Sequence, residues 1–310
     1  MSLKTKIKLG RSNILINEAF VDIPTCPKNL ELVYEISGNL NAPFIIIQGG
    51  INSSEHVASC NTNKNKGWWE NIVGLDKPID LNKFCVISIS YVVFEGVTSY
   101  DQAKAISILL NNLEINYVEY FIGYSYGGMV GLAFSELYPN MVNNIITLGA
   151  ASESVPQTYA LRLIQQKIVE INRGTTREKE SLELARQLGI ITYRSSYDLN
   201  TRFDNHTNSI VSYLKKKGED FSSVFSTEKF LSLSQSINNH KINPAKISVN
   251  KITLIGSDSD QITPPAQLTD LAKEFKIPCD VIIIDSIFGH DAYVVEIEKM
   301  TKIFKNIFSI

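Results

Sequence analysis

The sequence is poor in cysteine, which limits the kinds of site it can build. Only 4 of the 310 residues are cysteine, and they are widely separated, at Cys26, Cys60, Cys85 and Cys279. No two of them form a CxxC pair, and no histidine stands beside them at metal-ligand spacing. We therefore predict free, buried thiols, with neither a disulfide framework nor a metal site.

Charge of one sign and long apolar runs are also missing. The 30 basic and 32 acidic residues give a formal net charge of -2, which provides no bulk attraction to nucleic acid or to an anionic membrane. No apolar run approaches the length of a membrane span, and residues 1–20 lack the unbroken apolar stretch and cleavage site of a signal peptide. We expect a soluble, cytoplasmic protein whose partners include neither nucleic acid nor membrane.

The glycines form no dinucleotide-binding or phosphate-loop pattern, so no permanently bound nucleotide cofactor is expected. What is present is an ordinary globular composition, with 44% hydrophobic and 20% charged residues. The chain is therefore able to bury a sizeable core. At this length, one main core with an inserted cap is the default expectation.

Short apolar runs alternate with segments of helical periodicity, which predicts an α/β fold built on a mostly parallel, doubly wound sheet. The expected strands are 32–36, 44–48, 84–90, 117–123, 145–148, 252–255 and 281–284. A polar stretch interrupts this series, and its apolar residues are three and four apart, as in amphipathic helices. We predict a core of residues 1–152 and 247–310, with residues 153–246 inserted as a helical cap over the carboxyl ends of the strands.

The strongest local signal is the G-x-S-x-G pattern at residues 123–127, between an apolar run and a helix-like segment. This context is typical of the sharp strand-to-helix turn that exposes a nucleophilic serine, here Ser125. The same turn places the amide of Tyr126 at a helix N-terminus, where it can stabilise an oxyanion. The glycines after the strand 44–48 let the amide of Gly50 or Ile51 serve as the second donor.

A nucleophilic serine needs a base late in the chain if the order is serine, acid, histidine. His290 follows the last expected strand and fits this place. The other histidines, His56, His206 and His240, stand in an early loop or among polar cap residues, and we predict that they are not catalytic. The acid that orients the imidazole is expected after the strand 252–255.

That loop holds two candidates for the acid. Asp260 is preferred because it directly precedes the turn Gln261–Pro265, and Asp258 then becomes a solvated or turn-forming residue. Together these features predict an α/β-hydrolase fold with Ser125, Asp260 and His290 as its catalytic triad.

Beyond the triad, the sequence resembles one family over most of its length: the homoserine O-acyltransferases of the MetX type. The segments that carry the resemblance are GWWENIVGLDKPIDLNKFCVISIS, DQAKAISILLNNLEI, GYSYGGMVGLAFSELYP, LELARQLGIITYRS, SDSDQITPP and SIFGHDAYVVE. This family acylates homoserine from an acyl-CoA in methionine biosynthesis. The resemblance implies the same triad, with acyl-CoA as a co-substrate.

The resemblance also implies how the amino-acid acceptor is held. Arg186 would bind its carboxylate, since a guanidinium fork matches a carboxylate, and Asp291 would bind its ammonium group. Arg162 and Arg194 are two candidates for the carboxylate of a succinyl donor, with surface arginines as the equal alternative. Both acetyl-CoA and succinyl-CoA therefore remain open as donors.

The chain departs from the family pattern at residues 90–100. The family has a glycine-rich segment there, whereas this chain has a shorter, glycine-poor one, and this difference affects the expected entrance for acyl-CoA.

Serine is an alternative acceptor. A carboxylesterase or thioesterase with the same triad is the second hypothesis, and a non-enzymatic small-molecule-binding protein is the third. The oligomeric state is open, with a homodimer as one candidate.

Overall fold

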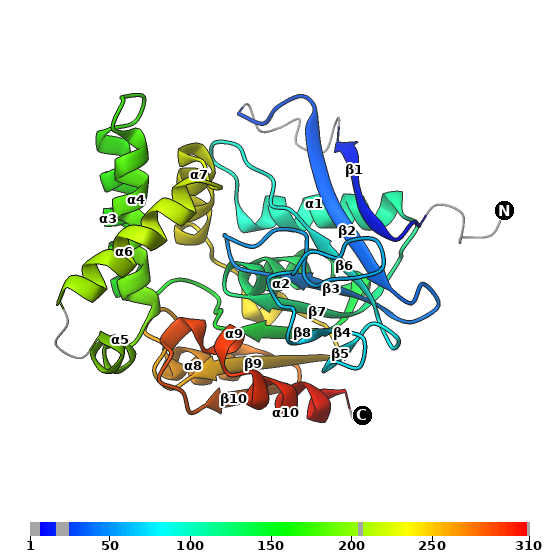
Figure 1. The fold of residues 1–310 in the computed structure, drawn as a ribbon. Helices are drawn as coiled ribbons and strands as arrows, with labels where there is room; N and C mark the ends of the chain where they lie inside the picture. The colour runs from blue at the N-terminus through cyan, green and yellow to red at the C-terminus, as the bar shows by residue number, and fades with distance from the viewer. Residues whose placement is uncertain (1–6, 17–24, 204–206, 309–310) are drawn as a thin grey trace.

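The computed structural model describes residues 7–16, 25–203 and 207–308. In this part of the chain, an eight-stranded sheet has the order β1-β2-β6-β3-β7-β8-β9-β10 (Figure 1). Its strands are β1 (Gly10–Ile16), β2 (Leu30–Gly38), β3 (Phe44–Gln48), β6 (Cys85–Ile89), β7 (Val118–Tyr124), β8 (Val142–Leu148), β9 (Lys251–Ser257) and β10 (Cys279–Ile284). Six strands that are consecutive in this order, β6, β3, β7, β8, β9 and β10, run parallel to one another. At the edge beside β6, β2 pairs antiparallel with β6 and β1 pairs antiparallel with β2.

All seven expected strands are present, with ends that differ by a few residues. Two features of the sheet were not predicted. The edge strand β1 is exposed along most of its length, so its sequence GRSNILI carries no buried-strand pattern. A small parallel pair, β4 (Val73–Gly74) with β5 (Ile79–Asp80), has only two residues in each strand, too few for a periodicity to register.

Two hydrophobic clusters cover the two faces of the sheet. Side chains alternate between them along each strand: Ile46 belongs to one cluster, and Ile45 and Ile47 to the other. The first cluster includes residues of α1 (Ser99–Asn112), α2 (Tyr126–Leu137) and α8 (Pro265–Glu274). The second includes Trp69 and residues of α9 (Ala292–Val295) and α10 (Ile297–Ile307). This double covering explains why the central strands are apolar on both faces.

The segment between β8 and β9 is helical. Its helices are α3 (Pro156–Ile171), α4 (Glu178–Tyr193), α5 (Ser196–Phe203), α6 (Thr207–Ser222) and α7 (Thr227–Asn238). Figure 1 shows α3, α4 and α6 standing at one end of the sheet, with α7 between them and the core. The sequence segments SLELARQLG, SIVSYLKKKGEDF and TEKFLSLSQSI, whose apolar residues are three and four apart, lie in α4, α6 and α7. The division into a core and a cap domain stays a prediction.

Among the described residues, no helix is long and apolar enough to cross a membrane. The four cysteines are free, as expected, but burial was predicted correctly only for Cys85. Cys26, Cys60 and Cys279 are half-buried, because they lie in loops or at the start of an edge strand. Burial raises the pKa of the Cys85 thiol to about 12, so this thiol stays protonated and unreactive.

Candidate active site

The carboxyl ends of the parallel strands meet at one edge of the sheet, and the sequence-predicted site residues gather there. Ser125 follows β7, the loop with Gly50 follows β3, and Asp260 follows β9. His290 follows β10 in a short 3-10 helix, Gly289–Asp291. Open α/β sheets place their sites at this edge because the loops that leave neighbouring strands converge on it.

Ser125 lies at the turn between β7 and α2 with a positive φ of 53°, a conformation that costs free energy for a residue with a Cβ. The turn is held because the Ser125 amide donates to the carbonyl of Leu148 at 2.8 Å. The glycines on either side are required by close contacts. A Cβ on Gly123 would lie 2.3 Å from the carbonyl oxygen of Gly127, and one on Gly127 would lie 2.2 Å from that of Gln48.

Ser125, His290 and Asp260 form a continuous hydrogen-bonded chain. His290 Nε2 lies 2.8 Å from Ser125 Oγ, and His290 Nδ1 lies 2.7 Å from Asp260 Oδ2. His290 and Asp260 are buried, whereas Ser125 is half-buried and can be reached from outside. This is the geometry by which a carboxylate orients an imidazole and the imidazole takes a proton from a hydroxyl.

Besides its predicted contact with His290, Asp260 accepts three hydrogen bonds that sequence reasoning did not anticipate. Its Oδ1 accepts from the amides of Ile262 at 2.8 Å and Thr263 at 3.1 Å, and its Oδ2 also accepts from the Tyr293 hydroxyl at 3.0 Å. Asp258, the alternative acid, is exposed, and its Oδ1 accepts from the Ser286 amide at 2.9 Å. It therefore braces the loop after β10 and has no contact with His290.

Three tyrosines that sequence reasoning missed, Tyr124, Tyr193 and Tyr293, lie beside the histidine. The Tyr124 hydroxyl donates to the carbonyl of His290 at 3.1 Å, and the ring of Tyr193 lies 5.9 Å from the imidazole. Burial, and then the nearby Asp260, raise the pKa of Tyr293 well above its ordinary value, so its hydroxyl remains a donor. Tyr293 stands three residues after His290 on a helical turn, and this spacing was the signal that could have revealed it.

Two of the expected oxyanion donors, Tyr126 and Gly50, lie beside Ser125. The Tyr126 amide belongs to the first turn of α2, whose amides lack acceptors within the helix. Gly50 lies against the serine, since a Cβ built on Gly50 would be 3.7 Å from Ser125 Cβ. The preceding residue, Gly49, is held by the Gly127 amide at 3.1 Å and by the Tyr91 hydroxyl. Ile51 is buried beside them.

Tyr91 lies in the segment 90–100, where the sequence departs from the family pattern. Tyr91, Val92 and Phe94 are buried, and the ring of Tyr91 packs 4.8 Å from that of Tyr126. The Tyr91 side chain thus supports the Gly49 loop from a segment that is glycine-rich in the family and glycine-poor in this chain.

The predicted acceptor residues lie on two different elements: Asp291 directly follows His290, and Arg186 contacts Tyr193, whose ring lies 5.9 Å from the imidazole. Arg186, on α4, is half-buried and stacks over the rings of Tyr193 at 5.5 Å and Phe221 at 5.1 Å. No carboxylate within the described residues pairs with it. Its guanidinium therefore remains available for an anionic ligand.

Asp291 is already engaged. Its Oδ2 lies 2.8 Å from Arg194 Nε, although the N–H is not directed at the oxygen, so the contact is an ion pair without a well-formed hydrogen bond. Arg194 also pairs with Asp198 at 3.2 Å. An ammonium group at Asp291 would share the carboxylate with Arg194.

The remaining histidines have other surroundings. His240 is buried, its Nδ1 lies 2.7 Å from Ser99 Oγ, and burial lowers its pKa to about 4, so it stays neutral. His56 pairs with Glu35 at 2.9 Å, on the β2 edge of the sheet. His206 lies outside the described residues. Neither His56 nor His240 contacts Ser125.

Comparison with known proteins places this arrangement in a family. The alpha/beta hydrolase fold family matches residues 42–296, and the chain belongs to it. This agrees with the predicted fold class, and the mostly parallel sheet with helices on both faces is its physical basis.

Within that family the chain is similar to named acyltransferases. It is 29% identical to a homoserine O-succinyltransferase of Xanthomonas campestris pv. campestris, over 89% of this chain and 78% of the relative. It is 27% identical to a serine O-succinyltransferase of Xylella fastidiosa, over 86% and 88%. A solved homoserine O-acetyltransferase of Staphylococcus aureus shares the fold with a TM-score of 0.84, at 21% identity over 97% of this chain and 95% of that one. These relatives support the resemblance to the MetX-type family and an acyltransferase enzyme.

Proposed function

We propose that this protein is a homoserine O-acyltransferase that takes an acetyl or succinyl group from an acyl-CoA. The observation that carries the proposal is the hydrogen-bonded chain from Ser125 through His290 to Asp260, with the unpaired Arg186 stacked on Tyr193 beside it. These three hydrogen-bonded residues supply a nucleophile and a base, and the arginine supplies a counter-charge for an amino-acid carboxylate.

In the first half-reaction, Ser125 Oγ attacks the thioester carbonyl while His290 Nε2 takes its proton. The amides of Tyr126 and of Gly50 or Ile51 stabilise the oxyanion. The carbon–sulfur bond then breaks, and the imidazolium returns the proton to the CoA sulfur, leaving CoA as a thiol and an acyl ester on Ser125. Asp260 stabilises the imidazolium throughout.

In the second half-reaction, the homoserine hydroxyl replaces CoA. His290 takes the hydroxyl proton, the oxygen attacks the ester carbonyl, and the proton passes to Ser125 Oγ as the ester bond breaks. The products are O-acylhomoserine and the free enzyme. No permanent cofactor is needed. Transfer outcompetes hydrolysis when the acceptor occupies the place that water would take.

Arg186 and Asp291 are proposed to seat the acceptor through its carboxylate and ammonium groups. The product would enter methionine biosynthesis. Serine is the second acceptor to test, since one of the relatives is a serine O-succinyltransferase. The two acceptors differ by one methylene, and that difference alone changes selectivity only roughly ten- to two-hundredfold.

The test follows free CoA from acetyl-CoA and succinyl-CoA, with and without homoserine or serine. Acceptor-dependent release is expected. Release at the same rate without an acceptor indicates a thioesterase and contradicts the proposal, and an esterase assay on a simple acyl ester then defines the hydrolase. No release from either donor favours a small-molecule-binding protein.

A further inference from the structure

Arg162 differs from the other arginines near the site in its surroundings. It lies on α3, half-buried, and its Nη1 donates to Asn238 Oδ1 at 2.6 Å and to Ser154 Oγ at 3.2 Å. Both partners are neutral, and no carboxylate in the described parts of the chain pairs with it. Burial lowers the pKa of Arg162 to about 10, which reflects the cost of a guanidinium held out of water without a counter-charge.

Contacts one helical turn to either side place Arg162 toward the site. Thr158, four residues earlier, donates to the carbonyl of Ile262 at 3.1 Å. The amide of Ile262 in turn binds Asp260. Residues four apart in a helix share a face, so Arg162 lies on the same face of α3 as Thr158, one turn from the contact with the loop that carries the acid.

On the other side of Arg162, the next turn of α3 reaches α4 beside the histidine. A Cβ on Gly189 would lie 3.4 Å from Gln165 Oε1 and 3.7 Å from the ring of Tyr193. Tyr193 is close enough to influence the pKa of Arg162, and its ring lies 5.9 Å from His290. Arg162 therefore lies between the acid loop and the tyrosine that lines the imidazole.

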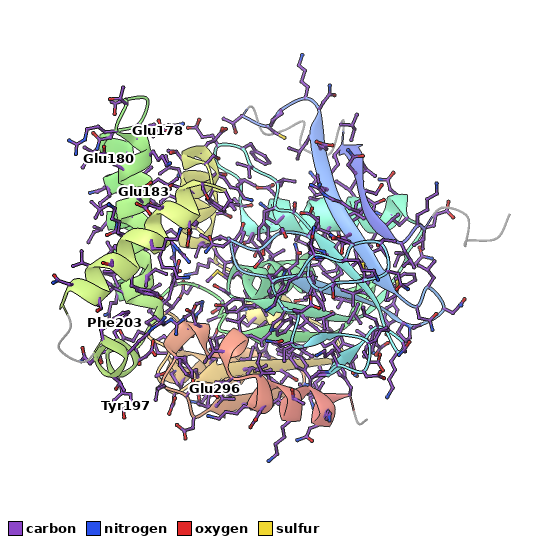
Figure 2. The ribbon with its side chains drawn as sticks, in the orientation of Figure 1. Glu178, Glu180, Glu183, Tyr197, Phe203 and Glu296 are labelled. Carbon is purple, nitrogen blue, oxygen red and sulfur yellow. The ribbon has the colours of Figure 1, made fainter. Side chains whose placement is uncertain are left out.

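Three glutamates of α4 have partners other than Arg162 and Arg186. Figure 2 shows Glu178, Glu180 and Glu183 on the part of α4 remote from α5, which carries Tyr197 and Phe203. Glu178 accepts from the Gly174 amide, Glu180 pairs with Arg177, and Glu183 accepts from Ser222. None of the three neutralises Arg162 or Arg186.

Within the described part of the chain, Arg162 and Arg186 have no carboxylate partner, whereas Arg194 is paired with Asp198 and Asp291. One arginine is accounted for by the amino-acid carboxylate in the proposed function. We propose that Arg162 binds the terminal carboxylate of a dicarboxylic acyl group, so that succinyl-CoA is the preferred donor. This inference rests on the proposed function and narrows it. Of the two sequence candidates for that role, Arg194 is paired with carboxylates, whereas among the described residues Arg162 has hydrogen bonds only to neutral partners.

Succinyl-CoA and butyryl-CoA test the proposal, because their acyl chains have the same number of carbons and differ in the terminal carboxylate. The wild-type protein should show a higher kcat/KM for succinyl-CoA with homoserine as acceptor. Arg162→Gln should lower the succinyl-to-butyryl ratio of kcat/KM by roughly ten- to hundredfold, the usual loss for a charge-assisted hydrogen bond. Arg162→Lys should retain part of the preference because it keeps the charge.

Arg177→Gln is the matched control, since Arg177 is an exposed arginine of the same helical segment and pairs only with Glu180 among the described residues. It should leave the donor ratio unchanged. A wild-type protein without preference for succinyl-CoA, or an equal fall for both donors in Arg162→Gln, overturns the inference. Acceptor-dependent CoA release from acetyl-CoA alone would preserve the proposed function while refuting this inference, whereas no acceptor-dependent release from any donor refutes the proposed function itself.

Discussion

The Tyr293 hydroxyl donates to Asp260 Oδ2 at 3.0 Å, and this is the same oxygen that His290 Nδ1 contacts at 2.7 Å. Tyr293 is fully buried, so the hydrogen bond is not exchanged for one with bulk water. A donor on the shared oxygen takes up part of the carboxylate's negative charge and leaves less of it to face the imidazole. Tyr293 is therefore a positioning residue that also sets how strongly Asp260 stabilises the imidazolium.

Tyr293→Phe removes the second donor from the carboxylate oxygen that faces His290. A buried hydrogen bond contributes roughly 0.5–1.5 kcal/mol, which corresponds to a displacement of the pH profile by at most about one pH unit. The acid limb of the pH profile of kcat/KM should move to higher pH by up to that amount. The measurement is the profile between pH 5 and pH 9 for both proteins.

Tyr124→Phe is the control for this prediction, because the Tyr124 hydroxyl binds the carbonyl of His290 and not Asp260. It removes a hydroxyl from the same pocket, and we expect its acid limb to stay at the wild-type pH. Equal shifts in both variants would mean that the change comes from altered packing.

The choice between the two aspartates predicts a large difference in activity. Asp260→Asn should lower turnover by roughly three to four orders of magnitude, because an amide neither fixes the correct tautomer nor stabilises the imidazolium. Asp258→Asn should have little effect, since an asparagine oxygen still accepts from the Ser286 amide. Steady-state kinetics of the two variants checks this, and the reverse order would make Asp258 the acid.

Much of this site was predictable because its signals are local. The strained serine turn requires Gly123 and Gly127, and that requirement is visible in the sequence as G-x-S-x-G. His290 and Asp260 each follow an apolar strand, so their convergence follows from the parallel sheet. The hydrogen bond of Tyr91 to Gly49 was not predictable, because it joins residues far apart in sequence and no local pattern marks a tertiary partner.

The arginines show the same limit. Residue type identified Arg162 and Arg194 as candidates for an acyl carboxylate, with surface arginines as the equal alternative, but only the fold shows that Arg194 is paired with Asp198 and Asp291. Ion pairing depends on which helices meet, and periodicity does not specify that. The edge strand β1 was missed for a different reason, since an exposed strand need not be apolar.

Arg186 provides a prediction about the acceptor. Arg186→Met keeps an unbranched side chain against Tyr193 and Phe221 but removes the guanidinium, so the helices should stay packed. The KM for homoserine should rise roughly ten- to hundredfold, while the burst of CoA in the first half-reaction survives. Rapid-quench kinetics separates the two steps. A joint loss of burst, steady state and thermal stability would assign Arg186 a purely structural role.

His56 predicts a pH dependence of stability. Burial opposes the charged form, but hydrogen bonds to the Asn65 carbonyl and Glu35, with the charge of Glu35, outweigh it and raise the pKa of His56. A raised folded-state pKa means that the stabilisation is complete below the unfolded value of about 6.5 and is lost as pH rises through the folded value. The difference in Tm between wild type and His56→Gln should therefore shrink from pH 6 to pH 9. A difference that grows with pH would show that the neutral imidazole is the stabilising form.

The central claim, a Ser125 acyl-enzyme that is discharged to an amino acid, is tested most directly by intact-protein mass spectrometry. Mixed with succinyl-CoA in the absence of acceptor, the protein should gain one succinyl group, and peptide mapping should place it on Ser125. Homoserine should remove it and yield O-succinylhomoserine, and Ser125→Ala should never acquire it. A protein that gains no acyl group from succinyl-CoA or acetyl-CoA, or one whose acyl group is lost to water at the same rate with and without homoserine, would contradict the account.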